Sequence, residues 1–326
     1  MSTPYDIVII GGGPAGLSAA CSIVRQTHSV LILDSGKYRN EDSYIHTLPT
    51  WDHRKAGEFR AAARKDLERY GVQAVTYENA EVATAEKLDD DLFRLTDADG
   101  KTWEGRKLIL ASGVVDVMPD IEGFHCLYCH GWEERDVESS GVLAEGDCGS
   151  VVVALHVARQ ALRLSKETTM YTLGNEKLAT DIAAAIGATA APRMKVDARA
   201  ISKLVKAPER AEVTIHFDDG TMKTEGYMVH KPKTILRGDL AHQLGLELTP
   251  QGMEIIFRQV VIALTAQGTI KVNPPFNQTS VKGVFSAGDA ANPMQTVTQA
   301  MFSGTACGGG APLQLQAEAY GQKALF

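Results

Sequence analysis

The stretch HCLYCHG, residues 125–131, holds two cysteines at a spacing that supports several kinds of chemistry. Cys126 and Cys129 are separated by two residues and flanked by His125 and His130. Such a pair can hold a metal ion, form a structural disulfide or cycle between dithiol and disulfide. A zinc site uses four ligands, and the sequence contains neither a second CxxC nor an HxxxH motif to complete one. We therefore expect no metal at this pair.

The composition helps to decide between the two remaining interpretations. The 326 residues include only five cysteines, and the start MSTPYDIVII lacks the basic end of a signal peptide. No apolar run reaches the ~18–20 residues of a membrane helix. These features predict a cytoplasmic protein, where reducing conditions disfavour a structural bridge and favour a redox-active pair. The net charge of −7 argues against nucleic acid or an anionic membrane as a partner.

The elements that must position this chemistry begin with residues 5–34. The run YDIVII is typical of a buried parallel strand, GGGPAG follows, and a helical stretch leads to a second strand, SVLILD. Gly11 permits the tight turn, Gly13 the close approach of a pyrophosphate, and Gly16 the close packing of helix on strand. Asp34 ends the second strand, where an acid accepts hydrogen bonds from ribose hydroxyls. The unit predicts a dinucleotide-binding fold without separating NAD from FAD.

Two later segments favour FAD. RKLILASG (106–113) indicates a buried strand that ends in a small-residue turn, and TSVKGVFSAGDAA (279–291) contains another strand before Asp289. With the N-terminal unit they resemble the flavin-binding segments of the two-domain pyridine nucleotide–disulfide oxidoreductases. In that family the pair at Gly288–Asp289 meets the ribityl chain and phosphate of FAD; taken alone, the pair would indicate a turn with an exposed acid. The residues that the resemblance places at FAD are Gly11, Gly13, Pro14, Ala15, Gly16, Asp34, Ser35, Arg39, Asn40, His46, Val82, Ala111, Gly113, Gly288, Asp289, Thr296 and Val297.

A second strand–turn–helix pattern occupies residues 140–165, followed by the strand TTMYTL at 168–173. The pattern repeats the architecture of the N-terminal unit after a change of composition beyond Val117. We predict an α/β protein with two Rossmann-like, three-layer ββα dinucleotide-binding domains, the second inserted into the first. The expected FAD domain is discontinuous, at 1–117 and 240–326, and the inserted domain covers 118–239.

The second domain lacks the features that bind NADPH. Its turn is EGDCGS, so the close-approach glycine is missing, and Glu145 and Asp147 stand where a diphosphate would lie. After the next strand, GNEK (174–177) offers one lysine and one acid in place of the arginines that hold a 2′-phosphate. We predict that NADPH does not bind, the alternative being a cofactor held by unusual contacts.

Nearly the whole chain resembles the thioredoxin reductase-like flavoproteins, and within them the fungal dithiol oxidases of the gliotoxin-biosynthesis type. The resemblance implies a homodimeric enzyme of secondary metabolism that closes a disulfide across a small-molecule dithiol and passes electrons through FAD to O2, giving H2O2. It also implies that Cys129 is the flavin-proximal sulfur and that Cys126 exchanges with substrate. The segments that carry it are DSGKYRN (34–40), LPTWDHRKAGEFRAAARKDL (48–67), FHCLYCHGWEERD (124–136), ALHVARQALRLS (154–165) and YTLGNEKLATDI (171–182).

The cycle needs a base for thiols whose pKa is near 8.5. His130 adjoins Cys129 and is the candidate, although many relatives carry aspartate there. The alternative for His130, and more so for His125 and His46, is a half-exposed turn residue.

Three features leave alternatives open. Only six residues separate Pro119 from Cys126, where relatives have a longer connection. The apolar stretch 251–268 is interpreted as a strand pair in the flavin domain or a dimer contact. The glycines at 308–310 predict either a break in a helix or close packing against a neighbour.

Two other functions compete with the oxidase. An NADPH-dependent disulfide reductase, such as one that serves thioredoxin, requires a working second nucleotide site. A non-catalytic redox-sensing flavoprotein would have no use for the intact CxxC motif.

Overall fold

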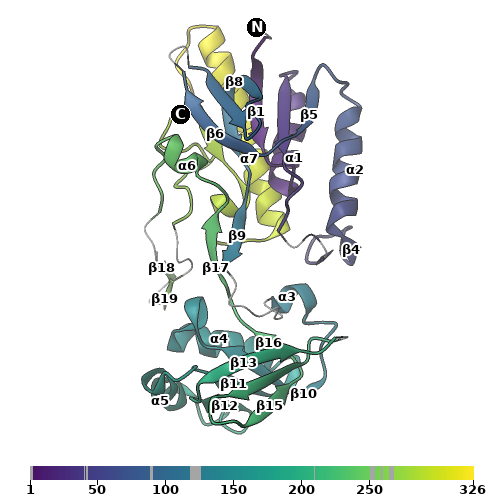
Figure 1. The fold of residues 1–326 in the computed structure, drawn as a ribbon. Helices are drawn as coiled ribbons and strands as arrows, with labels where there is room; N and C mark the ends of the chain where they lie inside the picture. Colours follow the sequence, from purple (N-terminus) through teal and green to yellow (C-terminus); the bar gives the residue numbers. More distant parts are fainter. Residues whose placement is uncertain are drawn as a thin grey trace. The chain divides into compact units, whose positions relative to one another are not determined.

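The computed structural model describes residues 3–39, 41, 43–88, 91–117, 126–208, 210–249, 254–257, 260–263 and 268–326, and the chain divides into two compact units (Figure 1). The first comprises Met1–Val115, Ile235–Gln251 and Gln267–Phe326, and the second Asp116–Thr234 with Gly252–Ala266. The chain returns to the first unit at Ile235, against residue 240 in the sequence-based division. The α/β architecture with two dinucleotide-binding folds is confirmed.

The first unit is built on a parallel sheet whose strands have the β-branched, apolar composition of strands buried on both faces. β1 lies between β2 and β8, so that Ile9 is opposite both Ile32 and Ile109. Because all three side chains are fully buried, they fix the register of the sheet. The strands of this sheet are β5 (Val75–Asn79), β2 (Val30–Asp34), β1 (Tyr5–Ile10), β8 (Thr102–Leu110) and β20 (Val284–Ser286).

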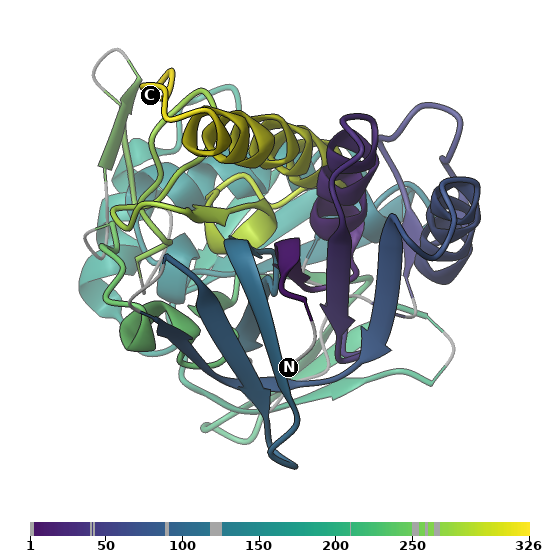
Figure 2. The same ribbon diagram turned by 90° about the horizontal axis from the view of Figure 1, so that it is seen from above.

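Helices cover one face of this sheet, and an antiparallel extension of the same sheet, which pairs with the first half of β8, packs over the other face. The helices are α1 (Pro14–Val24), α2 (Ala56–Glu68) and α7 (Val297–Ala319), and they can be followed from above in Figure 2. β6 (Val82–Lys87), β7 (Phe93–Asp97) and the short helix α6 (Leu240–Gln243) pack on the opposite core cluster. A short hairpin of β3 (Tyr44–Ile45) and β4 (Arg54–Lys55) precedes α2.

Glycines allow α7 to lie directly against α1. A Cβ atom at Gly304 would collide with the carbonyl oxygen of Ala15, and one at Gly308 would stand 2.5 Å from the carbonyl oxygen of Ala19. A Cβ at Gly310 would stand 2.5 Å from the Cβ of Phe276. α7 continues without a break through 308–310, so of the two alternatives for these glycines the close packing is confirmed.

The second unit repeats the strand–turn–helix–strand arrangement, as predicted. Its parallel sheet has the order β12 (Met194–Asp197), β11 (Ser165–Tyr171), β10 (Val137–Leu143) and β16 (Met228–Val229), with helices α4 (Val151–Ala161) and α5 (Glu176–Ala185). β11 begins three residues earlier than TTMYTL predicts. An antiparallel sheet of β13 (Ile201–Lys206), β14 (Val213–Phe217) and β15 (Met222–Glu225) completes the unit.

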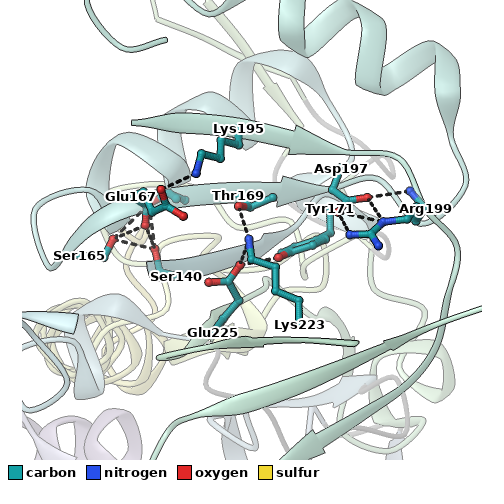
Figure 3. Close-up of polar contacts among 11 residues, drawn as sticks. Ser140, Ser165, Glu167, Thr169, Tyr171, Lys195, Asp197, Arg199, Lys223 and Glu225 are labelled. Carbon is teal, nitrogen blue, oxygen red and sulfur yellow. Dashed lines mark hydrogen bonds and ion pairs between the residues drawn. The ribbon is translucent and has the colours of Figure 1, made fainter. Parts of the chain in front are cut away.

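Buried polar side chains link β11 to β15 (Figure 3). The hydroxyl of Tyr171 donates to the fully buried carboxylate of Glu225. Lys223 Nζ lies 2.8 Å from Glu225 Oε1 and donates to Thr169 Oγ1 at 3.0 Å. Burial, and then the neighbouring Glu225, raises the pKa of Tyr171. The carboxylate is thus removed from water together with a cation and a hydroxyl donor, the condition under which burial of a charge is tolerated.

Two further strand pairs complete the described elements. β9 (Val114–Val117) pairs with β17 (Lys233–Leu236). The segment in which the chain leaves the first unit thus pairs with the segment in which it returns. β18 (Glu254–Phe257) pairs antiparallel with β19 (Val260–Ala263), so the apolar stretch 251–268 contains a strand pair. The pair belongs to the second unit and not, as predicted, to the flavin domain. Among the described helices, none has both the length and the apolar character to cross a membrane.

Candidate active site

Cys126 and Cys129 form a disulfide at the start of a single helical turn. Their Cα atoms are 5.2 Å apart, and α3 (Leu127–His130) begins directly after Cys126. The carbonyl oxygen of Cys126 accepts hydrogen bonds from the backbone N–H groups of Cys129 at 3.1 Å and His130 at 3.3 Å. The turn therefore holds the two sulfurs together through its own backbone, and both cysteines are partly exposed, as thiol exchange requires.

The turn is packed through a glycine that sequence reasoning did not single out. A Cβ at Gly131 would collide with the carbonyl oxygen of Leu127 and stand 2.7 Å from Leu164 Cδ1. Only a residue without a side chain lets α3 lie against the turn that joins α4 to β11. The glycine is visible in the sequence directly after Cys129 and His130, but its position there does not show that it packs against Leu164.

Two aromatic side chains are exposed beside the disulfide. Tyr128, between the cysteines, is 67% exposed, and its hydroxyl accepts a hydrogen bond from Gln160 Nε2 at 3.3 Å. Trp132 is 63% exposed, and the guanidinium of Arg135 lies 4.0 Å from its ring centroid. These rings are accessible apolar surface beside the two sulfurs.

His130 ends α3 and is half-buried, directly after Cys129. Its role as a base stays a prediction. His125, Pro119 and the short connection between Pro119 and Cys126 lie outside the described residues.

The first glycine turn has the geometry that a dinucleotide needs. Gly11 adopts φ = +113°, and a Cβ there would collide with the carbonyl oxygen of Ala111; a Cβ at Gly16 would collide with that of Gly11. No described atom lies within 4 Å of a Cβ built at Gly13, which leaves room for a pyrophosphate. Gly13 is the N-cap of α1, and no described side chain caps that helix, so its first N–H groups face this space.

Gly12 is a second position that sequence reasoning missed. A Cβ there would overlap the carboxylate of Asp34, so the GGG run keeps the turn against the end of β2. Asp34 is 8% exposed and accepts from the Tyr38 hydroxyl, from Arg64 and from the N–H of Gly36. Burial, followed by the hydrogen bond to Asp34, raises the pKa of Tyr38 to about 12. The acid expected at the ribose thus sits at the turn with a cation and a phenol beside it.

The C-terminal strand delivers its residues to the same turn. Gly288 has φ = +74°, donates its N–H to Ser303 Oγ at 2.9 Å, and would place a Cβ 3.1 Å from that of Ala15. Asp289 follows in the 3₁₀ turn η2 (Gly288–Ala290), with its carboxylate 3.1 Å from Arg39 Nη1. The same nitrogen of Arg39 donates to Gln295 Oε1 at 2.6 Å.

The remaining residues expected at FAD lie at several places. Pro14 and Ala15 open α1, Ala111 and Gly113 follow β8, and Thr296 caps α7 by accepting from the N–H of Gln299, with Val297 next. Ser35 accepts from the N–H of Lys37 directly after β2, and His46 bonds Asp52 within the β3–β4 hairpin. Val82 starts β6 and packs against the core on the strand-covered face. Asn40 lies outside the described residues.

The second glycine turn is built differently from the first. The 3₁₀ turn η1 (Gly146–Cys148) fills the position after β10, and the hydroxyl of Ser150 caps α4 by accepting from the N–H of Val153 at 3.4 Å. Asp147 forms an ion pair of 3.0 Å with Lys231. Glu145 is the acid of this turn that lines the neighbouring cleft. Burial raises the pKa of Cys148 to about 11, which makes it an inert thiol.

A cleft does open at this second turn, within the second unit. Asn175 caps α5 by accepting from the N–H of Leu178 at 3.0 Å, so the second helix start is also satisfied. One N–H group at each helix start is therefore already bonded to a side chain, and Glu145 lines the cleft, which is unfavourable for the diphosphate of NADPH. That NADPH does not bind stays a prediction. The cleft is lined by Ala144, Glu145, Gly146, Gly149, Thr172, Leu173, Asn175, Leu178 and Lys233.

Comparison with known proteins agrees with this geometry. A family model described as pyridine nucleotide-disulphide oxidoreductase matches residues 5–304, and members of this family typically bind FAD. Thioredoxin reductase tcpT of Claviceps purpurea is 44% identical over 336 residues, covering 100% of this chain and 98% of that protein. Thioredoxin reductase aclD of Aspergillus oryzae is 38% identical over 325 residues, covering 97% and 98%. The solved oxidoreductase from Agrobacterium tumefaciens superposes with a TM-score of 0.80 at 28% identity, covering 98% of this chain and 99% of that one.

Proposed function

The chain belongs to the pyridine nucleotide-disulphide oxidoreductases and is thioredoxin reductase-like, and on that premise we propose that it is an FAD-dependent dithiol oxidase acting on a small molecule. The observation that carries the proposal is the contrast between the two nucleotide turns. At the first, Gly13 leaves open space before an uncapped helix; at the second, Ser150 and Asn175 cap the helices. One dinucleotide and a redox disulfide are the parts that an oxidase needs.

The thiol chemistry follows from the disulfide of α3. A substrate thiolate attacks Cys126 Sγ, the bond to Cys129 breaks, and Cys129 leaves as a thiolate. The second substrate thiolate then attacks the substrate sulfur of the mixed disulfide, which releases the cyclic disulfide and frees Cys126. Two electrons have passed to the cysteine pair and two protons have left the substrate. FAD, when bound, supplies a two-electron acceptor that O2 reoxidises, so that O2 and the two protons yield H2O2.

The chain's own residues would serve both halves of this reaction. His130 is the group proposed to take up the substrate proton, since an imidazole titrates near neutral pH and this one adjoins Cys129. The Gly11–Gly16 turn, Asp34, Arg39 and Asp289 would hold the FAD. The partners we propose are a small dithiol and O2, in a cytoplasmic homodimer without nucleic acid or membrane.

A second candidate function is an NADPH-dependent thioredoxin reductase. It is favoured by the names of the relatives, which include a thioredoxin reductase 44% identical to this chain. That function needs NADPH to reach the second nucleotide fold, whose helix starts are capped and whose turn presents Glu145.

One experiment separates the two functions. Purified holoprotein is mixed anaerobically with a small dithiol or with NADPH, and the flavin absorbance is followed before and after air is admitted. The oxidase predicts bleaching by the dithiol alone, and colour and H2O2 returning in air. Bleaching by NADPH within one turnover would refute the oxidase proposal. The Cys126→Ser variant is the control, because it should retain its flavin and not be bleached by the dithiol.

A further inference from the structure

We propose that the β3–β4 hairpin of the first unit carries a binding site for a divalent transition-metal ion, with His46, Asp52 and His53 as ligands. In the described part of the chain, these three residues place one ligand atom each within 4.8 Å of one another. The site belongs to the first unit, whereas the disulfide belongs to the second; His46 is also one of the residues expected at FAD, so among the ligands the tests below change only Asp52 and His53.

The backbone pairing of the hairpin brings His46 and His53 together. Tyr44 pairs with Lys55 and Ile45 with Arg54, so continuation of the antiparallel register puts His46 opposite His53. The N–H of His53 donates to the carbonyl oxygen of Ile45 at 2.9 Å, and the two imidazole rings meet edge to face with centroids 4.7 Å apart. A seven-residue separation gives no ligand spacing along the chain, which is why the sequence motif does not reveal the pair.

The donor atoms lie within 4.8 Å of one another, somewhat wider than in a coordination shell. His46 Nδ1 lies 3.0 Å from one oxygen of Asp52, and His53 Nε2 lies 3.4 Å from the other. Zinc binds nitrogen and oxygen ligands at ~2.0–2.2 Å, so donors around a tetrahedral ion stand roughly 3.3–3.5 Å apart. His46 is anchored, with 14% of its side chain exposed, whereas Asp52 and His53 are 51% and 60% exposed. The two exposed side chains can therefore close on an ion arriving from solvent.

The chemistry of the donors selects the class of ion. Two imidazoles and one carboxylate suit Zn²⁺ and its neighbours in the first transition row, whereas Ca²⁺ and Mg²⁺ take oxygen ligands. Three protein ligands leave the fourth position of a tetrahedral ion for water or an exogenous group.

The loop backbone is held in an unusual conformation around these ligands. Thr47, Thr50 and His53 have φ of +62°, +72° and +58°, the left-handed region that residues other than glycine rarely adopt. Such strain persists only where the surroundings fix it, and it clusters at ligand sites. Trp51 packs edge to face on Phe59 of α2, which supplies part of that support.

The test uses the tag-free, air-oxidised holoprotein, so that Cys126 and Cys129 remain in their disulfide. After removal of metals with EDTA, equilibrium dialysis against Zn²⁺ and elemental analysis give the zinc bound per chain. We expect one ion in the wild type. The affinity should fall in His53→Ala and Asp52→Asn by more than the ~10–100-fold that changes around metal ligands typically cause. His242→Ala removes an exposed histidine of α6 and should leave binding unchanged.

A rescue variant separates coordination from folding of the loop. His53→Cys replaces one zinc ligand by another, so it should restore zinc uptake, whereas His53→Gln should not, although it keeps a polar side chain. Flavin content is measured in every variant and should stay at the wild-type level for the changes at Asp52 and His53. The proposal is overturned if the wild type binds no zinc, or if His53→Ala and Asp52→Asn bind it as the wild type does.

Discussion

The guanidinium of Arg39 lies 3.1 Å from the carboxylate of Asp289, although 250 positions separate the two residues in the chain. The pair joins the loop after β2 to the turn after β20. The two segments of the discontinuous first unit thus meet at the glycine turn through a charge-assisted contact. Both residues are expected at FAD, so this pair links assembly of the unit to binding of the cofactor.

Replacing Arg39 with methionine should weaken FAD retention. The variant removes the hydrogen bonds to Asp289 and Gln295 while keeping an unbranched side chain. A hydrogen bond to a charged group contributes about 1.5–3 kcal/mol, which corresponds to roughly 10–100-fold in affinity. The measurement is flavin released on dialysis. Arg94→Met is the matched control, since this arginine of β7 pairs with Glu86 of β6 and Glu104 of β8, away from the glycine turn. Equal retention by both variants would contradict the prediction.

Adjacent glycines of α7 should respond to alanine in opposite directions. At Gly308 a Cβ would stand 2.5 Å from the carbonyl oxygen of Ala19 and 2.8 Å from Ser22 Cβ, so alanine should destabilise by about 1–3 kcal/mol. At Gly309 the nearest atom is Phe276 Cε1 at 3.9 Å, and alanine should stabilise the helix by about 0.5–1 kcal/mol. Equilibrium denaturation measures both. Stabilisation by both substitutions would show that helix propensity, not packing on α1, controls this segment.

Much of the fold was predictable because its signals are local. The run of buried strand, GGGPAG and helix needs only neighbouring residues to be recognised, and Gly11, Gly13 and Gly16 perform the roles expected of them. The second unit was predictable for the same reason, as a repeat of that pattern in residues 137–171.

What could not be predicted depends on contacts between distant residues. A Cβ at Gly131 would stand 2.7 Å from Leu164, 33 positions away, and Tyr171 donates to Glu225, 54 positions away. The close approach of His46 and His53 arises from the register of a two-residue strand pair. Neither periodicity nor spacing encodes such partners, since each is set only once the elements have packed.

Stability should fall as the pH rises from about 10 to about 12, in part because of Tyr38. The folded pKa of Tyr38 is about 12, raised by burial and by the hydrogen bond to Asp34, against an unfolded value near 10. In this window the unfolded chain has released the proton and the folded chain still holds it, so ΔG of unfolding falls as pH rises. The stabilisation is fully present below pH ~10.

The measurement is denaturation of the wild type and of Tyr38→Phe at several pH values. The difference between their stabilities should change across pH 10–12 and stay constant below it. Tyr320→Phe is the control, because that tyrosine is 78% exposed. A difference that does not vary with pH would contradict the assigned coupling between Tyr38 and Asp34.

Replacing His130 with glutamine should slow the reduction of the disulfide by a small dithiol by about 10²–10⁴-fold at neutral pH, the usual contribution of a general base. The N–H of residue 130 would still donate to Cys126, so the turn of α3 should keep its backbone hydrogen bonds. Stopped-flow bleaching of the flavin under anaerobic conditions reports the step. As the pH rises past ~8.5, substrate thiols ionise unaided, and the deficit should shrink.

The matched control is His156→Gln, which changes an exposed histidine of α4 that contacts Gln160. It should react at the wild-type rate throughout. A deficit in His130→Gln that is equally large at pH 7 and pH 9.5 would show that His130 positions the cysteines and does not take up the proton. Because a base is needed only while the substrate is a thiol, the dependence of the deficit on pH, and not its size, decides the role of this histidine.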